Sequence, residues 1–203
     1  GVVQLWDVTT GAHRQTLTGA ARPLPALAFA PPQTHGQLLA GGDVDGRVYL
    51  WRVGDAAPLH RLDGHREEAH ALAFSPDGAL LASGSHDRTV QVWEVASGQI
   101  RHTLRTHTQP IRALAISADG QTLASGGDDT FVALWDLRSG QVRRLLLGLI
   151  HRIAYLAFSA SADAPPTLAT VGSDQSVGLW DAEAGQRLHQ LQAYSHHLYT
   201  LDL

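Results

Sequence analysis

The stretch LASGSHDRTVQVWE, residues 81–94, places Ser83, His86 and Asp87 close together and ends on Trp93 and a glutamate. Serine, histidine and aspartate are the residue types of a catalytic triad. The run TVQVW is rich in β-branched and aromatic residues, and LLASG just before it is largely apolar, so the polar residues between them also fit a turn joining two strands. Whether they catalyse a reaction or stabilise a fold depends on how often the pattern recurs.

Tryptophan recurs at a nearly fixed interval along the chain. It stands at positions 6, 51, 93, 135 and 180, with gaps of 45, 42, 42 and 45 residues. Both longer gaps contain three extra residues at one equivalent place, between Phe29 and Leu38 and between Phe158 and Thr167. The underlying period is therefore 42 residues, which predicts a repeated structural unit.

Each period contains four short segments, a to d, that are predicted to be strands. In one repeat they are ALAF at 71–74, LLASG at 80–84, TVQVW at 89–93 and QIRHTL at 99–104. Segments a, b and c are nearly all apolar, as in strands covered on both faces, whereas segment d alternates as an edge strand does. One such sheet cannot bury both faces alone, but copies stacked around an axis can, and this predicts a β-propeller.

The residues of this repeat resemble the motifs of WD-repeat β-propellers. The SPDG turn at 75–78, the LASGS strand and the aspartate of SHDRT match that family, and Gly64-His65 matches its glycine-histidine signature. The Trp-Asp or Trp-Glu pairs are Trp6-Asp7, Trp93-Glu94, Trp135-Asp136 and Trp180-Asp181. The resemblance covers essentially the whole chain and implies an all-β propeller of four-stranded antiparallel blades.

The resemblance also implies a role for the serine, histidine and aspartate. In that family a buried tetrad links Trp to Ser or Thr, then to His, then to Asp. Two complete sets match here: His65, Ser83, Asp87 and Trp93, and His107, Ser125, Asp129 and Trp135. Partial sets contain Asp45 and Trp51, and Thr170, Asp174 and Trp180, because Ala20, Gly41 and Leu149 replace the other members.

Two arguments favour this structural role over catalysis. A buried indole N–H needs an acceptor, and a polar chain that ends on a carboxylate satisfies every donor in it. An active site is needed once, whereas this constellation occurs twice in full. We therefore predict a chain that is not an enzyme.

The chain is expected to be one propeller domain over residues 1–203. Complete repeats are predicted at 20–63, 64–105, 106–147 and 148–192, with partial repeats at 1–19 and 193–203. The chain opens on a segment c and ends on a segment a, so a sheet shared by both termini would lack its segment b. Seven sheets of this period need about 290 residues. We therefore expect an open or incomplete ring from a longer protein.

The composition of the chain argues against nucleic acid, a membrane and a metal ion as partners. The net charge is −4 and no basic face is evident, which disfavours nucleic acid. No apolar run is long enough to cross a membrane and no signal peptide is recognisable, so a cytoplasmic protein is expected. Cysteine is absent; of the 12 histidines, two belong to the tetrads, His13, His60, His102 and His189 fall in outer strands or their turns, and the adjacent pair His196-His197 is poorly placed to bind one ion. No metal and no cofactor are predicted.

Function is expected on the face formed by the b–c turns within the repeats and the d–a connections between them, because binding residues concentrate in loops on rigid scaffolds. We predict a scaffold that binds a protein or peptide partner there. An alternative is that the chain is the sensor part of a larger signalling enzyme, such as a kinase or nucleotide-driven switch. The candidate partner-binding residues are Arg22, Arg47, Arg66, Glu67, His86, Arg88, Gln109, Asp128, Thr130, His151, Arg152 and Gln175.

Overall fold

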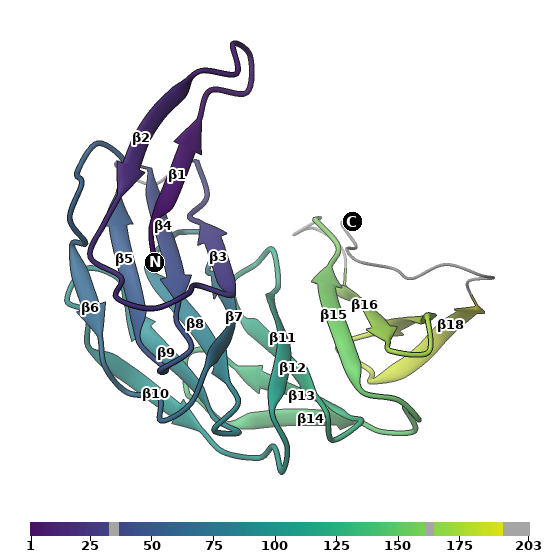
Figure 1. Ribbon diagram of the computed structural model, residues 1–203. Helices are drawn as coiled ribbons and strands as arrows, with labels where there is room; N and C mark the ends of the chain where they lie inside the picture. The colour runs from purple at the N-terminus through teal and green to yellow at the C-terminus, as the bar shows by residue number, and fades with distance from the viewer. Residues whose placement is uncertain (33–36, 161–164, 193–203) are drawn as a thin grey trace.

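The computed structural model describes residues 1–32, 37–160 and 165–192, and this part of the chain consists of strands and their connections without a helix. The strands form five antiparallel sheets that stand side by side along an arc, from the purple β1–β2 hairpin to the yellow β18 (Figure 1). No helix that could span a membrane is found in these residues. The partial repeat expected at 193–203 lies outside the described residues.

Four of the sheets are four-stranded blades in which each strand pairs with the next one along the chain. The first blade contains β3 (Ala26–Phe29), β4 (Leu38–Gly42), β5 (Val48–Arg52) and β6 (His60–Leu62). The second contains β7 (Ala69–Phe74), β8 (Leu80–Ser85), β9 (Val90–Glu94) and β10 (Ile100–Leu104). The third contains β11 (Ile111–Ile116), β12 (Thr122–Gly127), β13 (Val132–Asp136) and β14 (Val142–Leu146). The fourth contains β15 (Ile153–Phe158), β16 (Thr167–Gly172), β17 (Ser176–Asp181) and β18 (Gln186–Gln192).

The strands of each blade follow the predicted order, with strand a on the inner side of the arc and strand d on the outer side (Figure 1). The b and c strands are almost completely buried, as β12 and β13 show, whereas the d strand β14 is exposed except at Leu146. The a strands differ from the prediction that both of their faces are covered. In β11 buried residues alternate with half-buried ones, because this strand borders the open centre of the arc.

Neighbouring blades bury their apolar faces against each other. The core between the first two blades contains Leu38, Leu50 and Trp93, and Leu72 and Phe74 of β7 pack against it from the second blade. Equivalent cores lie between the second and third and between the third and fourth blades. Each blade therefore depends on its neighbour to cover the face that it cannot cover alone.

The first four-stranded blade is only half covered on its other side. The two-stranded sheet of β1 (Val3–Trp6) and β2 (His13–Leu17) packs against its outer part, where Val3 and Leu17 join a core with Trp51. Its inner strand lacks such a cover, since Phe29 is 53% exposed while the equivalent Phe158 of the last blade is 9% exposed.

The predicted open ring is confirmed. Among the described residues β1 pairs only with β2, and no sheet joins the two ends of the arc.

Candidate partner-binding face and its supporting networks

The second blade contains a continuous hydrogen-bonded network at its core. Trp93 Nε1 donates to Ser83 Oγ at 2.8 Å, and Ser83 Oγ lies 2.7 Å from His65 Nε2. His65 Nδ1 lies 3.1 Å from Asp87 Oδ2, and the His65 side chain is fully buried. These four residues come from strands c and b, from the d–a connection and from the b–c turn. The network therefore ties the two loops of the blade to its core.

The third blade repeats this arrangement with nearly the same distances. Trp135 Nε1 donates to Ser125 Oγ at 2.8 Å, and Ser125 Oγ lies 2.7 Å from His107 Nε2. His107 Nδ1 is 3.0 and 2.9 Å from the two carboxylate oxygens of Asp129. The hydroxyl in each network is buried beneath a tryptophan, so a substrate cannot reach it.

Sequence reasoning missed one further member of each network. Thr89 donates its hydroxyl to Asp87 Oδ1 at 2.6 Å and lies 3.2 Å from His65 Nδ1. The equivalent residue of the third blade is Phe131, whose ring stacks on His107 at 4.7 Å between centroids. The same position of the repeat thus contacts the histidine through a hydroxyl in the second blade and through an aromatic ring in the third. Because the two residue types differ, the sequence shows no shared motif at this position.

Gly64 shows why a glycine precedes the network histidine in the second blade. A Cβ atom at this position would collide with Gln91 Oε1 and would lie 2.7 Å from the ring of Trp93. Glycine therefore lets the d–a connection approach the buried tryptophan closely enough for the adjacent His65 to reach Ser83.

Asp87 is held as a carboxylate by its surroundings. Burial raises its pKa, but the hydrogen bonds from His65, Thr89 and the Arg66 amide outweigh burial and hold the pKa well below its ordinary value of 3.8. Hydrogen bonds to a charged carboxylate favour the ionised form.

The first four-stranded blade has a different arrangement from the predicted partial set. Trp51 Nε1 donates to the Thr18 backbone oxygen at 2.8 Å. Asp45 does not join this bond, because Ala20 stands where a buried histidine would face it, and it pairs at the surface with Arg22 at 2.9 Å. The buried acid is Asp43, which accepts from Tyr49 Oη at 3.2 Å. No signal in the repeat pattern pointed to Asp43.

The fourth blade keeps only one link of the network. Trp180 Nε1 donates to Thr170 Oγ1 at 3.1 Å, and Thr170 Oγ1 donates to the Gly178 backbone oxygen at 3.4 Å. His151 lies 3.5 Å from Asp174 on the surface, with half of its side chain exposed. The structure therefore places Thr170 and Trp180 in contact and leaves Asp174 outside their contact.

The b–c turns share an unusual backbone conformation. Gly46, Arg88, Thr130 and Gln175 occupy equivalent positions, five residues before the tryptophan of each blade, and have φ angles of 86°, 69°, 62° and 68°. Positive φ is costly for a residue with a Cβ atom, and most of all for a β-branched one such as Thr130. Three blades therefore place a strained side chain where the first blade has glycine.

A backbone hydrogen bond fixes each b–c turn to the d–a connection before it. In each blade an amide of the turn donates to a carbonyl oxygen of the connection: Val44 to Pro23 at 3.3 Å, His86 to Glu68 at 3.0 Å, Asp128 to Pro110 at 3.0 Å, and Ser173 to Arg152 at 2.9 Å. The two sets of loops thus form one face, which we call the turn face.

All candidate partner-binding residues lie in these loops, but they differ in their pairing. Several have ion-pair partners: Arg22 and Arg47 contact Asp45, His151 contacts Asp174, and Asp128 contacts Arg112. The guanidinium groups of Arg66, Arg88 and Arg152 are exposed and form no ion pair with any other described residue. The turn face therefore presents three unneutralised positive charges at Arg66, Arg88 and Arg152.

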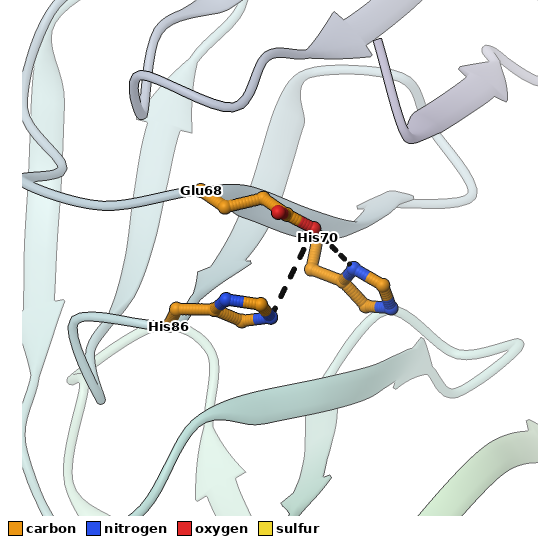
Figure 2. A group of neighbouring side chains, drawn as sticks. All are labelled: Glu68, His70 and His86. Carbon is orange, nitrogen blue, oxygen red and sulfur yellow. Dashed lines mark hydrogen bonds and ion pairs between the residues drawn. The ribbon is translucent and has the colours of Figure 1, made fainter. Parts of the chain in front are cut away.

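His86 belongs to a cluster that sequence reasoning did not anticipate (Figure 2). Its ring stacks on His70 at 5.3 Å between centroids, and Arg112 Nη1 donates to its Nε2 at 2.9 Å. Burial, followed by the charge of Arg112, lowers the pKa of His86. His70 also lines a cavity of about 720 Å³ at the inner rim of the arc, together with Pro25, Arg112, Arg152, Tyr155 and Gln175.

The WD40 family, described as WD domain, G-beta repeat, matches residues 56–94 and 98–136. No curated protein matches the chain. The matched segments contain Ser83, Asp87 and Trp93 of one complete network and Ser125, Asp129 and Trp135 of the other. Residues 56–94 and 98–136 are therefore WD40 repeats, and the four-stranded antiparallel sheets of the described residues are those of a WD-repeat propeller.

Proposed function

We propose that this chain is a non-catalytic scaffold that binds a protein or peptide partner on the turn face. WD40 repeats are generally interaction scaffolds, and the polar networks described above are accounted for by the fold. The observation that carries the proposal is the positive φ of Arg88, Thr130 and Gln175. Gly46 shows that the fold accepts glycine at this position, so the costly side chains of the other blades fit a role outside the fold.

The charge of the turn face indicates the chemistry of the partner. The side chains of Arg66, Arg88 and Arg152 are exposed and form no ion pair with another described residue. A guanidinium group binds a carboxylate with two parallel hydrogen bonds, which makes arginine well suited to acidic partners. The partner is therefore a protein or peptide that presents acidic side chains.

The test is a quantitative pull-down with three forms of the chain at two salt concentrations. The wild type should retain partners that a variant with Arg66→Glu, Arg88→Glu and Arg152→Glu loses, and high salt should weaken the retained binding. The matched control carries the same charge changes away from the turn face, at Arg52, Arg101 and Arg138. If the control loses the same partners, or the first variant keeps them, the turn face is not the binding surface.

A third variant separates binding from folding. Arg88→Gly removes the side chain and relieves the positive φ, so it should not lower the free energy of unfolding. We expect it to weaken partner binding all the same. Binding equal to the wild type would show that the strained side chain at this position has no part in recognition.

A further inference from the structure

Three side chains with metal-binding groups converge at the inner rim of the second blade (Figure 2). Glu68 Oε1 lies 2.7 Å from His70 Nδ1 and 3.9 Å from His86 Nε2. One ligand atom from each residue lies within 4.8 Å of the others, and this is the one such group in residues 1–32, 37–160 and 165–192. The three side chains are 26%, 33% and 23% exposed, so an ion from solvent can reach them.

The other blades show that the fold does not require these residues. Glu68 stands where they have Pro23, Pro110 and Arg152; His70 stands where they have Pro25, Arg112 and Ala154; His86 stands where they have Val44, Asp128 and Ser173. All four blades nevertheless make the same backbone bond between the two loops. Three ligand-type residues at one point of one blade therefore need an explanation beyond the propeller.

The backbone already holds these residues in place. Glu68 directly precedes β7, and His70 is the second residue of that strand, where the pairing with β8 shifts register between Ala69 and Ala71. The His86 amide donates to the Glu68 carbonyl at 3.0 Å, which fixes the b–c turn against the start of the strand. The position of the cluster is thus set by the strand and by this bond rather than by flexible side chains alone.

We propose that Glu68, His70 and His86 bind a divalent transition metal ion, with Zn²⁺ as the fitting ion. Two imidazoles and one carboxylate form a common three-residue ligand set for zinc, which leaves one coordination position open. Bonds of about 2.0–2.2 Å place tetrahedral ligand atoms roughly 3.3 Å apart. The present separations of 2.7 and 3.9 Å lie on either side of that distance. Small side-chain rotations are therefore enough to form the site, and the proposal does not depend on the function proposed above.

Arg112 controls access to this site. Its Nη1 donates to His86 Nε2 at 2.9 Å, so an ion must displace this bond to reach the nitrogen. Its Nε and Nη2 bind Asp128 at 3.2 and 3.0 Å, so Arg112 stays anchored when Nη1 is released. The positive charge beside the ligands also repels a cation. Removal of the Arg112 side-chain charge should therefore tighten metal binding.

The experiment is calorimetric titration of the full chain with ZnCl₂, supported by the visible absorption of Co²⁺ at the same site. We expect one equivalent to bind. His70→Gln or His86→Gln should weaken it at least about tenfold, the scale of effect seen when even supporting residues of metal sites are changed. Arg112→Gln should tighten it several-fold. The matched control is His102→Gln, a half-buried histidine outside the cluster, which should leave the affinity unchanged.

Thermal unfolding of each variant without metal confirms that it is folded, and added Zn²⁺ should raise the midpoint for the wild type more than for His86→Gln. Three results would overturn the proposal: no binding by the wild type, equal affinity of the wild type and His86→Gln, or weaker binding by Arg112→Gln. Binding lost equally on His102→Gln would likewise show scattered histidine sites rather than this one.

Discussion

Ser83 and Ser125 are small residues on which the largest buried side chains of their blades depend. A carboxylate only accepts hydrogen bonds, so the histidine Nδ1 that faces Asp87 or Asp129 must carry the proton. In the neutral imidazole Nε2 is then an acceptor, so the serine hydroxyl donates to it while accepting from the tryptophan Nε1. Each serine hydroxyl therefore hydrogen-bonds two side chains, whereas the Thr170 hydroxyl hydrogen-bonds one side chain, that of Trp180, and a backbone oxygen.

Ser83→Ala should lower the free energy of unfolding by about 2–4 kcal/mol, because both Trp93 Nε1 and His65 Nε2 lose their partner in a buried site. Thr170→Val should cost less, about 1–3 kcal/mol, because only one side chain, that of Trp180, loses its partner and the bond to the Gly178 backbone oxygen is long at 3.4 Å. Urea unfolding measures both values. Ser97→Ala, at an exposed turn, is the control and should be close to neutral. A larger cost at Thr170 than at Ser83 would contradict the network described here.

The lowered pKa of Asp87 predicts how acid affects stability. A carboxyl group whose pKa is lower in the folded protein than in the unfolded chain stabilises the fold at pH values above the unfolded pKa, which is near the ordinary value of 3.8. This stabilisation is lost as the pH falls from there toward the pKa of the folded state. The stability of the wild type should therefore fall steeply below the unfolded pKa. Asp87→Asn should be less stable at pH 7 and should fall less steeply in urea unfolding from pH 7 to pH 3. The control Asp55→Asn changes an exposed carboxyl without a side-chain partner among the described residues and should follow the wild type.

At the scale of the element, the strands of one blade differ in how firmly they are held. The b and c strands β8, β9, β12 and β13 have a paired strand on each side and neighbouring blades on both faces. Within the described residues the β1–β2 hairpin pairs with no third strand, and Trp6 is 56% exposed where the other tryptophans of the repeat are buried. A two-stranded hairpin alone is marginally stable in water.

Hydrogen exchange should separate these elements. We expect the amides of β8 and β12 to be protected close to the level of global unfolding, and those of β1 and β2 to exchange by local opening at a much lower free energy. Mass spectrometry of peptides from each strand measures the difference. Equal protection of β1 and β12 would mean that the hairpin is held by contacts beyond those with the first blade.

The sequence allowed much of the element order to be predicted, and the reasons are local. Apolar b and c segments, glycine turns and a fixed tryptophan spacing specify four strands per repeat, and the residues of both complete networks recur at the same spacing. The pairing of Asp43 with Tyr49, the two roles of the position of Thr89 and Phe131, and the cluster at Glu68 were not predicted. Each arises from a substitution in one blade only, so no periodic pattern reveals it.

At the scale of the whole molecule, one sheet face at the end of the arc has no neighbouring blade among residues 1–32, 37–160 and 165–192. Leu27 and Phe29 of β3 are 52% and 53% exposed, although the equivalent Leu156 and Phe158 are buried in the core between the third and fourth blades. The difference is one of position in the arc, because the segments themselves are alike: ALAF in β3 and YLAF in β15.

Matched substitutions test this arrangement in solution. Phe158→Ala should lower the free energy of unfolding by about 3–5 kcal/mol, as expected for a buried aromatic ring. Phe29→Ala should cost less than about 1 kcal/mol, because its ring is already half in water. Denaturant unfolding at two protein concentrations gives both values and shows whether they depend on association. Equal costs would mean that another surface covers β3.

The backbone bond between the b–c turn and the d–a connection before it recurs at the same place in all four blades. The side chains beside this bond therefore stand at equivalent positions, which are His70 and His86 in the second blade and Arg112 and Asp128 in the third. A contact on this rim can be moved by one step around the arc by exchanging one such pair for the other, while the scaffold beneath stays the same. The side-chain chemistry of this rim therefore changes from one blade to the next while the backbone bond beneath it stays the same.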